Sequence, residues 1–597
     1  MIENLYVPKS YGTYSDTCLM LGLACLAEYA LGATEQKQRI QLIDEGIYYQ
    51  IHLNTTMDLS KIEAVTYFDL FPIVVGAKTD TKKIPEEVGY FRTVENSQAR
   101  SLYKNWRIET KGKEKWREDA PDPPDRRTQN GTILTSMRHD RNHNGLWEGA
   151  WNLREHFGDL VSTILEVFSN HNILVQGSAV DTIAKRFKQR TNAKLPTQAS
   201  AVKIYMPSSI QGVNRILADG IGSSSQKDSW LNLWLIAKGL FDFALSERVK
   251  VAENTFDWRV VVLEPKDISL SHYRSVLSDL KKLNPPGSGY GIARFDAELV
   301  LRFSQEMLNL SCQTGRKPKL VNKFKGSHFG SKGQVYGLKD VFSLGLPDWM
   351  KVSSNEIRKA ITFHKVLAEH LSVVKSLDEK HTEILAAYRD FITGSQLKLF
   401  FPFQLLYADY CAKRIAKEEY ARLFSRTGLD IMIKSLLSSN NEPKENQETI
   451  NIENVIYDEG FERIAKAINY ATVRAGQILV KKEKDGQPYP KKDFEFKRFY
   501  GLAQRLGSRT SSREEFLGEL AAFITEYKSE YLRLKNKLGK GEIMILSDVN
   551  VTDLDRVTEL ILNWGTNSSL IPNLLIAYGH CYWDRKNNRS TDDNRDR

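Results

Sequence analysis

Residues 18–33 have the sequence CLMLGLACLAEYALGA, and residues 39–53 follow as RIQLIDEGIYYQIHL. The first stretch is apolar nearly throughout, as in a helix that is buried on all sides. Its upstream flank holds Glu3, Lys9 and Asp16 rather than a positive run, so we expect a core helix and not a signal peptide. In the second stretch, β-branched and aromatic residues alternate around Asp-Glu-Gly, which predicts a β-hairpin. These two stretches together indicate a mixed α/β region.

The same mixture continues downstream, and helices then dominate. Residues 229–245, SWLNLWLIAKGLFDFAL, predict a second core helix, and residues 257–264, DWRVVVLE, predict a buried strand. From 346 to 430, and again after the polar linker 438–451, charged and apolar residues interleave at helical spacing. We expect an α+β protein, with a mixed α/β N-terminal two-thirds and a C-terminal α-helical bundle. The expected domains are an N-terminal α/β region (1–118), a central α/β region with basic loops for DNA recognition (131–345), a helical connector (346–437) and a helical domain (452–585).

The composition is that of an ordinary folded protein, with 597 residues, of which 41% are hydrophobic and 26% charged. These fractions exclude a collagen-like, disulfide-stapled or wholly disordered chain. Five cysteines without a CxxC pair argue against structural zinc and fit a reducing cytoplasm. Because no unbroken run of about 18 apolar residues occurs, no membrane span is expected. The net charge of +10 is modest, so the distribution of charge is more informative than the sum.

Positive charge is concentrated in three windows. Residues 100–117 hold seven basic and two acidic residues, with Tyr103 and Trp106 among them. Residues 314–340 hold seven basic residues and one Asp, on what the glycines and serines predict to be a flexible loop. Residues 461–540 hold 18 basic and 10 acidic residues, on helices and on a loop between them. Cations beside aromatic rings are typical of a nucleic-acid surface, although a solvated protein face has the same composition.

Residues 138–143, RHDRNH, are the nearest approach to a catalytic motif. The alternative to a binding role is a metal-dependent nuclease that uses His139, Asp140 and His143, but such centres need further His and Asp ligands. HExxH and serine-nucleophile motifs are absent from the sequence, so we expect no catalysis, no cofactor and no metal site. Arginine and asparagine contact base edges well, which makes three residues of this segment candidate DNA contacts. They are Arg138, Arg141 and Asn142.

Several short motifs, spread along most of the chain, point to the same protein family. They are DTCLMLGLACLAEYAL at 16–31 with its hairpin, QGVNR at 211–215, SWL at 229–231 followed by Gly239, AI at 467–468, RFYGLA at 498–503, EF at 515–516, FITEY at 523–527 and LLIAYG at 574–579. Together they resemble the large subunit of type I CRISPR surveillance complexes (Cascade), of the I-A/I-B-like sort. The last five motifs are similar to a fused, helical small-subunit domain of that family.

The resemblance implies a non-enzymatic subunit of a prokaryotic, cytoplasmic, RNA-guided antiviral complex. Such a subunit recognises the protospacer-adjacent motif in duplex DNA and helps to start unwinding and R-loop formation, while the guide RNA supplies sequence specificity. Its helical C-terminal domain stabilises the displaced strand. The implied partners are guide RNA, target double-stranded DNA, the backbone subunits, the subunit that caps the guide 5′ end, separate small subunits, and a recruited helicase-nuclease or a transposition adaptor, with no membrane.

The resemblance and the charge windows together nominate site residues. No shared motif identifies the motif-reading residues, so chemistry nominates Arg138, Arg141, Asn142, Gln211, Asn214, Arg215, Lys323, Lys325 and Lys332. The displaced-strand groove is expected to be lined by Arg463, Lys466, Arg474, Lys481, Lys482, Arg498 and Arg505. RNA or backbone contacts are expected from Arg100, Lys104 and Arg107.

Two alternatives stay open at this point. In several systems of this family the small subunit is translated from an internal start, and Met432 would give a product of 166 residues, 432–597. Met432 could equally be a core methionine. The chain could also be a scaffold that binds protein partners through its helical half. A scaffold predicts little salt dependence of nucleic-acid binding, because few phosphates would be neutralised.

Overall fold

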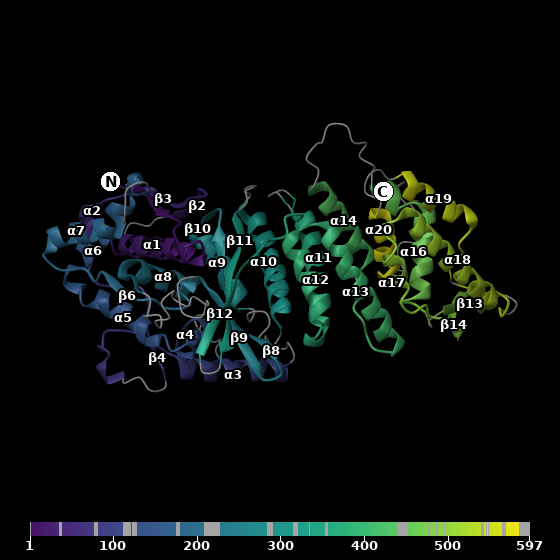
Figure 1. Ribbon diagram of the computed structural model, residues 1–597, viewed down its shortest axis with the longest axis horizontal. Helices are drawn as coiled ribbons and strands as arrows, with labels where there is room; N and C mark the ends of the chain where they lie inside the picture. The colour runs from purple at the N-terminus through teal and green to yellow at the C-terminus, as the bar shows by residue number, and fades with distance from the viewer. Residues whose placement is uncertain are drawn as a thin grey trace, which may run out of the picture. The chain divides into compact units, whose positions relative to one another are not determined.

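In the computed structural model, the chain divides into two compact units (Figure 1). The first unit comprises Met1–Leu346 and Ser353–Asn355, and the second comprises Pro347–Val352 and Glu356–Arg597. The structure describes residues 2–34, 39–76, 81–110, 121, 128–174, 179–207, 227–282, 291–314, 320–332, 335–350, 352, 356–439, 452–475, 478–484, 487–494, 496–538, 542–544, 546, 548–563 and 569–583. The fold class is α+β, as predicted, with mixed elements in the N-terminal part and helices toward the C-terminus. The finer division into four domains stays a prediction.

The first unit begins with a four-stranded antiparallel sheet. Its order is β1-β3-β2-β10, with β1 at Ile2–Pro8, β2 at Ile40–Asp44, β3 at Tyr48–Met57 and β10 at Asp267–Ser269. Strands β2 and β3 are the predicted hairpin, and alternate residues of β2 are buried. Strand β10 comes from far downstream, so this sheet joins distant parts of the sequence.

Helix α1, Tyr14–Ala33, is the predicted core helix and lies beside α8, Trp230–Phe243 (Figure 1). Two glycines allow their backbones to approach closely. A Cβ on Gly22 would lie 1.9 Å from the carbonyl oxygen of Leu235, and one on Gly239 would lie 2.0 Å from that of Cys18. Any larger residue would push the two helices apart.

Helix α1 is also the one helix of the described residues with the length and hydropathy of a membrane span, and 78% of that apolar stretch is buried. Asp16 and Glu28 interrupt the apolar run of this helix, so the sequence alone did not indicate a possible membrane span. Burial of this kind is what the core helix of a folded domain shows.

A second antiparallel sheet has the order β12-β11-β9-β8. Its strands are β8 (Leu245–Ala252), β9 (Thr255–Pro265), β11 (Val321–Lys332) and β12 (Val335–Leu344). The expectation of a flexible loop over 314–340 is therefore wrong for β11 and β12. The glycines of β11 serve packing, since a Cβ on Gly326 would lie 2.3 Å from the ring of Phe342. Phe324 and Phe329 of the same strand are buried.

The remaining elements of the first unit are mostly helices. They are α2 (Leu59–Glu63), β4 (Ile73–Val75) parallel to β5 (Tyr90–Arg92), α3 (Thr93–Thr110), α4 (Thr128–Ser136), α5 (Asp140–Trp151), α6 (Phe157–Phe168), α7 (Ala179–Thr191), β6 (Gln198–Ser200) antiparallel to β7 (Lys227–Ser229), α9 (Leu270–Lys282) and α10 (Ile292–Thr314).

The second unit is largely helical. Its helices are α11 (Ile357–Ser376), α12 (Thr382–Gly394), α13 (Leu397–Ala416), α14 (Arg426–Ser439), α15 (Ile452–Ile456), α16 (Glu459–Ala471), α17 (Leu502–Gly507), α18 (Arg513–Lys535), α19 (Val551–Asn563) and α20 (Leu570–Gly579). Helix α16 buries Phe461, Ile464 and Ile468 on one face.

One part of the second unit departs from the expected helical bundle. Strands β13 (Ile478–Lys484) and β14 (Gln487–Phe494) form an antiparallel hairpin, and β15 (Glu542–Met544) pairs with the other side of β13. The prediction of a basic loop is wrong for this segment. The run Ile-Leu-Val at the start of β13 and the aromatic residues of β14 favour strand, and the many lysines obscure that pattern.

Candidate nucleic-acid interface

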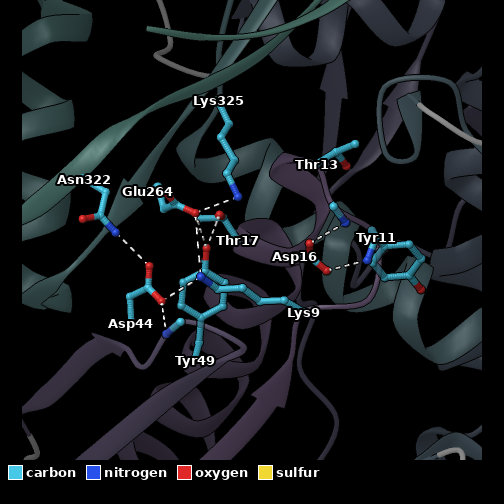
Figure 2. Close-up of polar contacts among 12 residues, drawn as sticks. Lys9, Tyr11, Thr13, Asp16, Thr17, Asp44, Tyr49, Glu264, Asn322 and Lys325 are labelled. Atoms are coloured by element: carbon cyan, nitrogen blue, oxygen red, sulfur yellow. Dashed lines mark hydrogen bonds and ion pairs between the residues drawn. The ribbon is translucent and has the colours of Figure 1, made fainter. Parts of the chain in front are cut away.

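The lysines of β11 have different surroundings. Lys325 points toward Glu264, with its Nζ 2.7 Å from Oε1, and its side chain is only 18% exposed (Figure 2). Lys323 is half-buried, and the side chain of Lys332 lies outside the described residues. Because Lys325 neutralises an interior carboxylate, we remove it from the candidate phosphate contacts. Lys323 stays a candidate.

Glu264 and Lys325 belong to a buried polar network (Figure 2). Lys9 Nζ lies 2.7 Å from Oδ1 of Asp44 and 3.9 Å from Oε1 of Glu264. Tyr49 donates its hydroxyl to Glu264 at 3.1 Å. Two lysines thus balance two carboxylates inside the first unit, where an unpaired charge would be costly. The network connects β2, β3, β9 and β11 with the residue that follows β1, and it serves the fold.

Asp16, beside this network, is a structural acid as well (Figure 2). It accepts backbone N–H groups from Ser10, Tyr11 and Gly12, each at 2.8 Å. Burial raises the pKa of Asp16, although these three hydrogen bonds oppose the rise by favouring the charged form. The carboxyl group is committed to the loop that precedes α1.

The turn between α4 and α5 presents the strongest candidates. Arg138 and Arg141 are exposed, and neither forms an ion pair within the part of the chain that the structure describes. Arg138 has a φ of 60°, in the left-handed region that favours glycine. Placing an arginine there costs about 1 kcal/mol of backbone strain, so a role for the side chain is worth testing. Asn142 follows Arg141 in α5, and its side-chain amide nitrogen lies 3.4 Å from Nδ1 of His139.

The structure brings this turn close to the end of the β11–β12 hairpin. Lys203 connects the two, since its Nζ donates to the carbonyl oxygen of Tyr336 at 2.7 Å, in β12. Burial, together with the nearby charge of Lys203, lowers the pKa of His139 to about 4. Lys203 therefore adds a third cation near Arg138 and Arg141. Sequence reasoning missed it because it stands alone in the apolar run AVKIYM.

In the part of the chain that the structure describes, the histidines of the same segment are not grouped as metal ligands. His143 is buried; its Nε2 donates to the carbonyl oxygen of Pro72 at 3.0 Å, and its Nδ1 accepts from Tyr205 at 2.5 Å. Burial lowers its pKa to about 4, so the ring is neutral and both nitrogens are engaged. Among the described residues, no group of three His, Cys, Asp or Glu side chains is placed to hold a metal ion. This geometry disfavours the nuclease that uses His139, Asp140 and His143.

Arg100, on α3, is bound inside the first unit. Its Nη2 lies 3.0 Å from Oε2 of Glu247, a fully buried carboxylate that also accepts from Gln129 at 3.1 Å. Burial raises the pKa of Glu247, and Arg100 opposes that rise. Arg100 therefore fixes α3 to β8 and is a weak candidate for RNA contact. The side chains of Lys104 and Arg107 lie outside the described residues.

In the second unit, the expected strand-groove residues are occupied within the chain. The contacts are Arg463 with Asp553 at 3.1 Å, Lys466 with Glu462 at 3.2 Å, Arg505 with Glu519 at 2.6 Å, and Arg474 with the carbonyl oxygen of Trp583 at 3.3 Å. Arg498 donates to the carbonyl oxygens of Thr472 at 2.8 Å and Ala475 at 2.6 Å. The three ion pairs reduce the positive charge that helices α16 and α17 offer to a strand, and the carbonyl contacts hold Arg474 and Arg498 against the chain.

Several candidates lie where nothing is described. Gln211, Asn214 and Arg215 fall in residues 208–226, outside the described residues, and the side chains of Lys481 and Lys482 are outside them too. The backbone of the last two is described and belongs to β13.

No protein-family model matches the chain, and no curated protein matches it either. The resemblance to the large subunit of type I CRISPR complexes therefore stands on the quoted motifs alone.

Proposed function

We propose that this protein is a non-catalytic, DNA-binding subunit of an RNA-guided complex of the type I CRISPR kind. In this proposal, the first unit recognises a short motif in duplex DNA and helps to start strand separation. The second unit stabilises the displaced strand and contacts separate small subunits.

One observation supports the proposal most strongly. The α4–α5 turn holds Arg138 and Arg141 exposed and unpaired within the described part of the chain, with Lys203 and the β11–β12 hairpin beside them. Arginine reads guanine edges and phosphates through two parallel hydrogen bonds. Most other predicted cations with described side chains are bound within the chain, so this turn is the best-placed surface for a nucleic acid.

The proposal also includes an internal start at Met432. Its side chain is fully buried, in the middle of α14. A product that begins there lacks Asp430, which accepts a hydrogen bond from Tyr578 at 2.5 Å. It also lacks Arg426, which pairs with Glu462. We therefore expect such a product to need a partner subunit in place of these lost contacts.

The test is a pull-down from the native host through a C-terminal tag, followed by RNA sequencing and protein gels. Short RNAs with one repeat-derived 5′ sequence and many different spacers are the expected result. A second tagged band of 166 residues, 432–597, is expected for the internal start. If no RNA is recovered from the intact complex, the proposed function is wrong. If the short band is absent, only the internal start is wrong.

A binding assay then tests the turn. The purified complex is titrated with duplex DNA that carries a randomised motif, at several salt concentrations. Arg138→Ala with Arg141→Ala should flatten the log–log salt slope by about 2 and weaken motif discrimination. The matched control is Arg154→Ala with Arg186→Ala, two exposed arginines that already pair with acids. Equal effects of the two double variants would contradict the assignment to the turn.

A further inference from the structure

We infer that the β13–β14 hairpin is a second DNA contact, which binds the backbone of duplex DNA without reading its sequence. The inference rests on the proposed function, to which it adds a site on the second unit. The hairpin formed by Ile478–Lys484 and Gln487–Phe494 is called the basic ribbon.

The basic ribbon carries an excess of charge. Its strands hold five lysines, at 481, 482, 484, 491 and 492, against Glu483 and Asp493. On helices α16 and α17, by contrast, the predicted cations are paired with acids, as Arg463 is with Asp553. The ribbon therefore keeps an excess of lysines, whereas the predicted cations of α16 and α17 are paired with acids.

The backbone register opposes the lysines of the ribbon with neutral residues. Across the hairpin, the pairs are Lys481 with Pro490, Lys482 with Tyr489, Lys484 with Gln487, Lys491 with Val480 and Lys492 with Leu479. Opposite charges that face each other across strands stabilise a sheet, and the hairpin lacks such pairs for its lysines. On the outer side of β13, Lys482 is opposite Glu542 of β15. Four of the five lysines therefore have no acidic residue opposite them in the described sheet.

The outer strand of the ribbon is unsuited to pairing with another strand. In the described sheet, whose order is β14-β13-β15, strand β14 lies at an edge. Pro488 and Pro490 stand two residues apart and have no N–H, so they remove two donors from one side of β14. Proline within a sheet is tolerated where that side faces away from the partner strand. Strand addition by a protein partner is thus disfavoured, and charge is the feature that the ribbon offers.

Duplex DNA matches both the charge and the shape of the ribbon. Strand β15 pairs with β13 only at Val480–Lys482, so the ribbon is two-stranded at its Lys484–Gln487 end. Neighbouring strands lie about 4.8 Å apart, so this two-stranded end fits within the major groove, about 12 Å wide. The groove is flanked by phosphates on both strands, which lysines neutralise without base specificity. Lysine and proline also protect sheet edges from aggregation, and the experiment must separate that role from binding.

The experiment compares the full-length chain with a ribbon variant, in which Lys481, Lys482, Lys491 and Lys492 are replaced by Gln. Binding to a fluorescent duplex lacking any motif is measured between about 50 and 200 mM salt. If all four lysines meet phosphates, the salt slope falls by about 3.6. The wild-type affinity then decreases about 150-fold more than that of the variant over this range.

Two controls accompany the ribbon variant. A helix variant replaces Lys359, Lys380, Lys413 and Lys417 of the same unit by Gln, which removes the same charge, and should keep the wild-type slope. A second ribbon variant replaces the four lysines by Arg, which keeps the charge and should keep the affinity. Thermal unfolding and light scattering of all variants show whether folding or aggregation has changed.

Each outcome decides the inference. The inference is supported if the Gln ribbon variant alone has a flattened salt slope. Its thermal unfolding must be unchanged, and the Arg ribbon variant must keep the wild-type affinity. Equal slopes for the ribbon and helix variants overturn it, as does a loss of affinity that appears only with single-stranded DNA. If the ribbon fails while guide-like RNA still co-purifies, the proposed function stands without this site. If the wild-type chain carries no RNA and binds no DNA, both are wrong.

Discussion

Replacing Lys325 by Met tests whether this lysine serves the fold or a nucleic acid. The change removes the ammonium group that lies 2.7 Å from Glu264 and keeps most of the apolar stem. Glu264, whose side chain is only 5% exposed, would keep Tyr49 at 3.1 Å and Lys9 at 3.9 Å. Removing one partner of a buried ion pair costs about 3–5 kcal/mol. Because Lys9 still compensates in part, we expect a loss near the lower limit, about 3 kcal/mol.

The assay is urea unfolding of the full chain, followed by tryptophan fluorescence, with DNA binding measured on the same preparations. Lys413→Met in the second unit, an exposed lysine that pairs with Asp409, is the matched control and should change stability by less than about 1 kcal/mol. Adding Glu264→Gln to Lys325→Met should recover much of the loss, because the carboxylate is then no longer an unpaired charge. If unfolding of Lys325→Met matches wild type while DNA affinity falls, the reasoning is refuted, and Lys325 contacts phosphates instead.

Three further predictions concern stability. Arg498→Met should lower the free energy of unfolding by about 2 kcal/mol, because the carbonyl oxygen of Ala475 loses its donor and that of Thr472 keeps only the N–H of Ala475, at 3.4 Å. Urea unfolding checks this, and an unchanged midpoint would contradict it. Burial lowers the pKa of His143 to about 4, against about 6.5 in the unfolded chain. Between these two pH values the unfolded state therefore binds more protons than the folded state. The free energy of unfolding should fall as the pH decreases from 6.5 to 4, by up to about 3 kcal/mol. Unfolding at about pH 7.5 and 4.5 should show a smaller decrease for His143→Gln than for wild type. Gly22→Ala should cost about 3 kcal/mol or more, because its Cβ would lie 1.9 Å from a backbone oxygen of α8; thermal unfolding close to that of wild type would show that the helices can separate at little cost.

Sequence patterns within a single segment correctly predicted the core helix and the first hairpin. The helix at Tyr14–Ala33 and the hairpin of β2 and β3 are confirmed, because apolar runs and strict alternation specify burial directly. The strands at Val321–Lys332 and Ile478–Lys484 were missed for one shared reason. Glycine and lysine are common in loops, but in β11 the glycine at 326 makes room for an aromatic ring from the neighbouring strand.

The candidate site was less predictable than the fold. A count of charges along the sequence treats every cation as available, whereas the structure pairs Lys325 with Glu264 and Arg463 with Asp553. These partners are far apart in the sequence, so no pattern within one segment predicts the pairing. Arg138 and Arg141 remain candidates because their turn has no acid positioned to pair with them in the described residues. Lys203 joins them only in the folded chain, where its Nζ donates to the carbonyl oxygen of Tyr336 and its charge acts on His139.

The order in which the first unit can assemble follows from its topology. On the ribosome, α1 emerges about 200 residues before two later elements of its unit. Helix α8 packs against α1, and strand β10 completes the sheet β1-β3-β2-β10. At about 5–20 residues per second, the nascent chain therefore exposes α1, the described helix with the length and hydropathy of a membrane span, for roughly 10–40 seconds. During this interval the emerging segment offers chaperones and membrane-targeting factors the same signal as a genuine membrane span. We expect synthesis of this protein to depend on holding factors, and a piece that ends at residue 118 to aggregate.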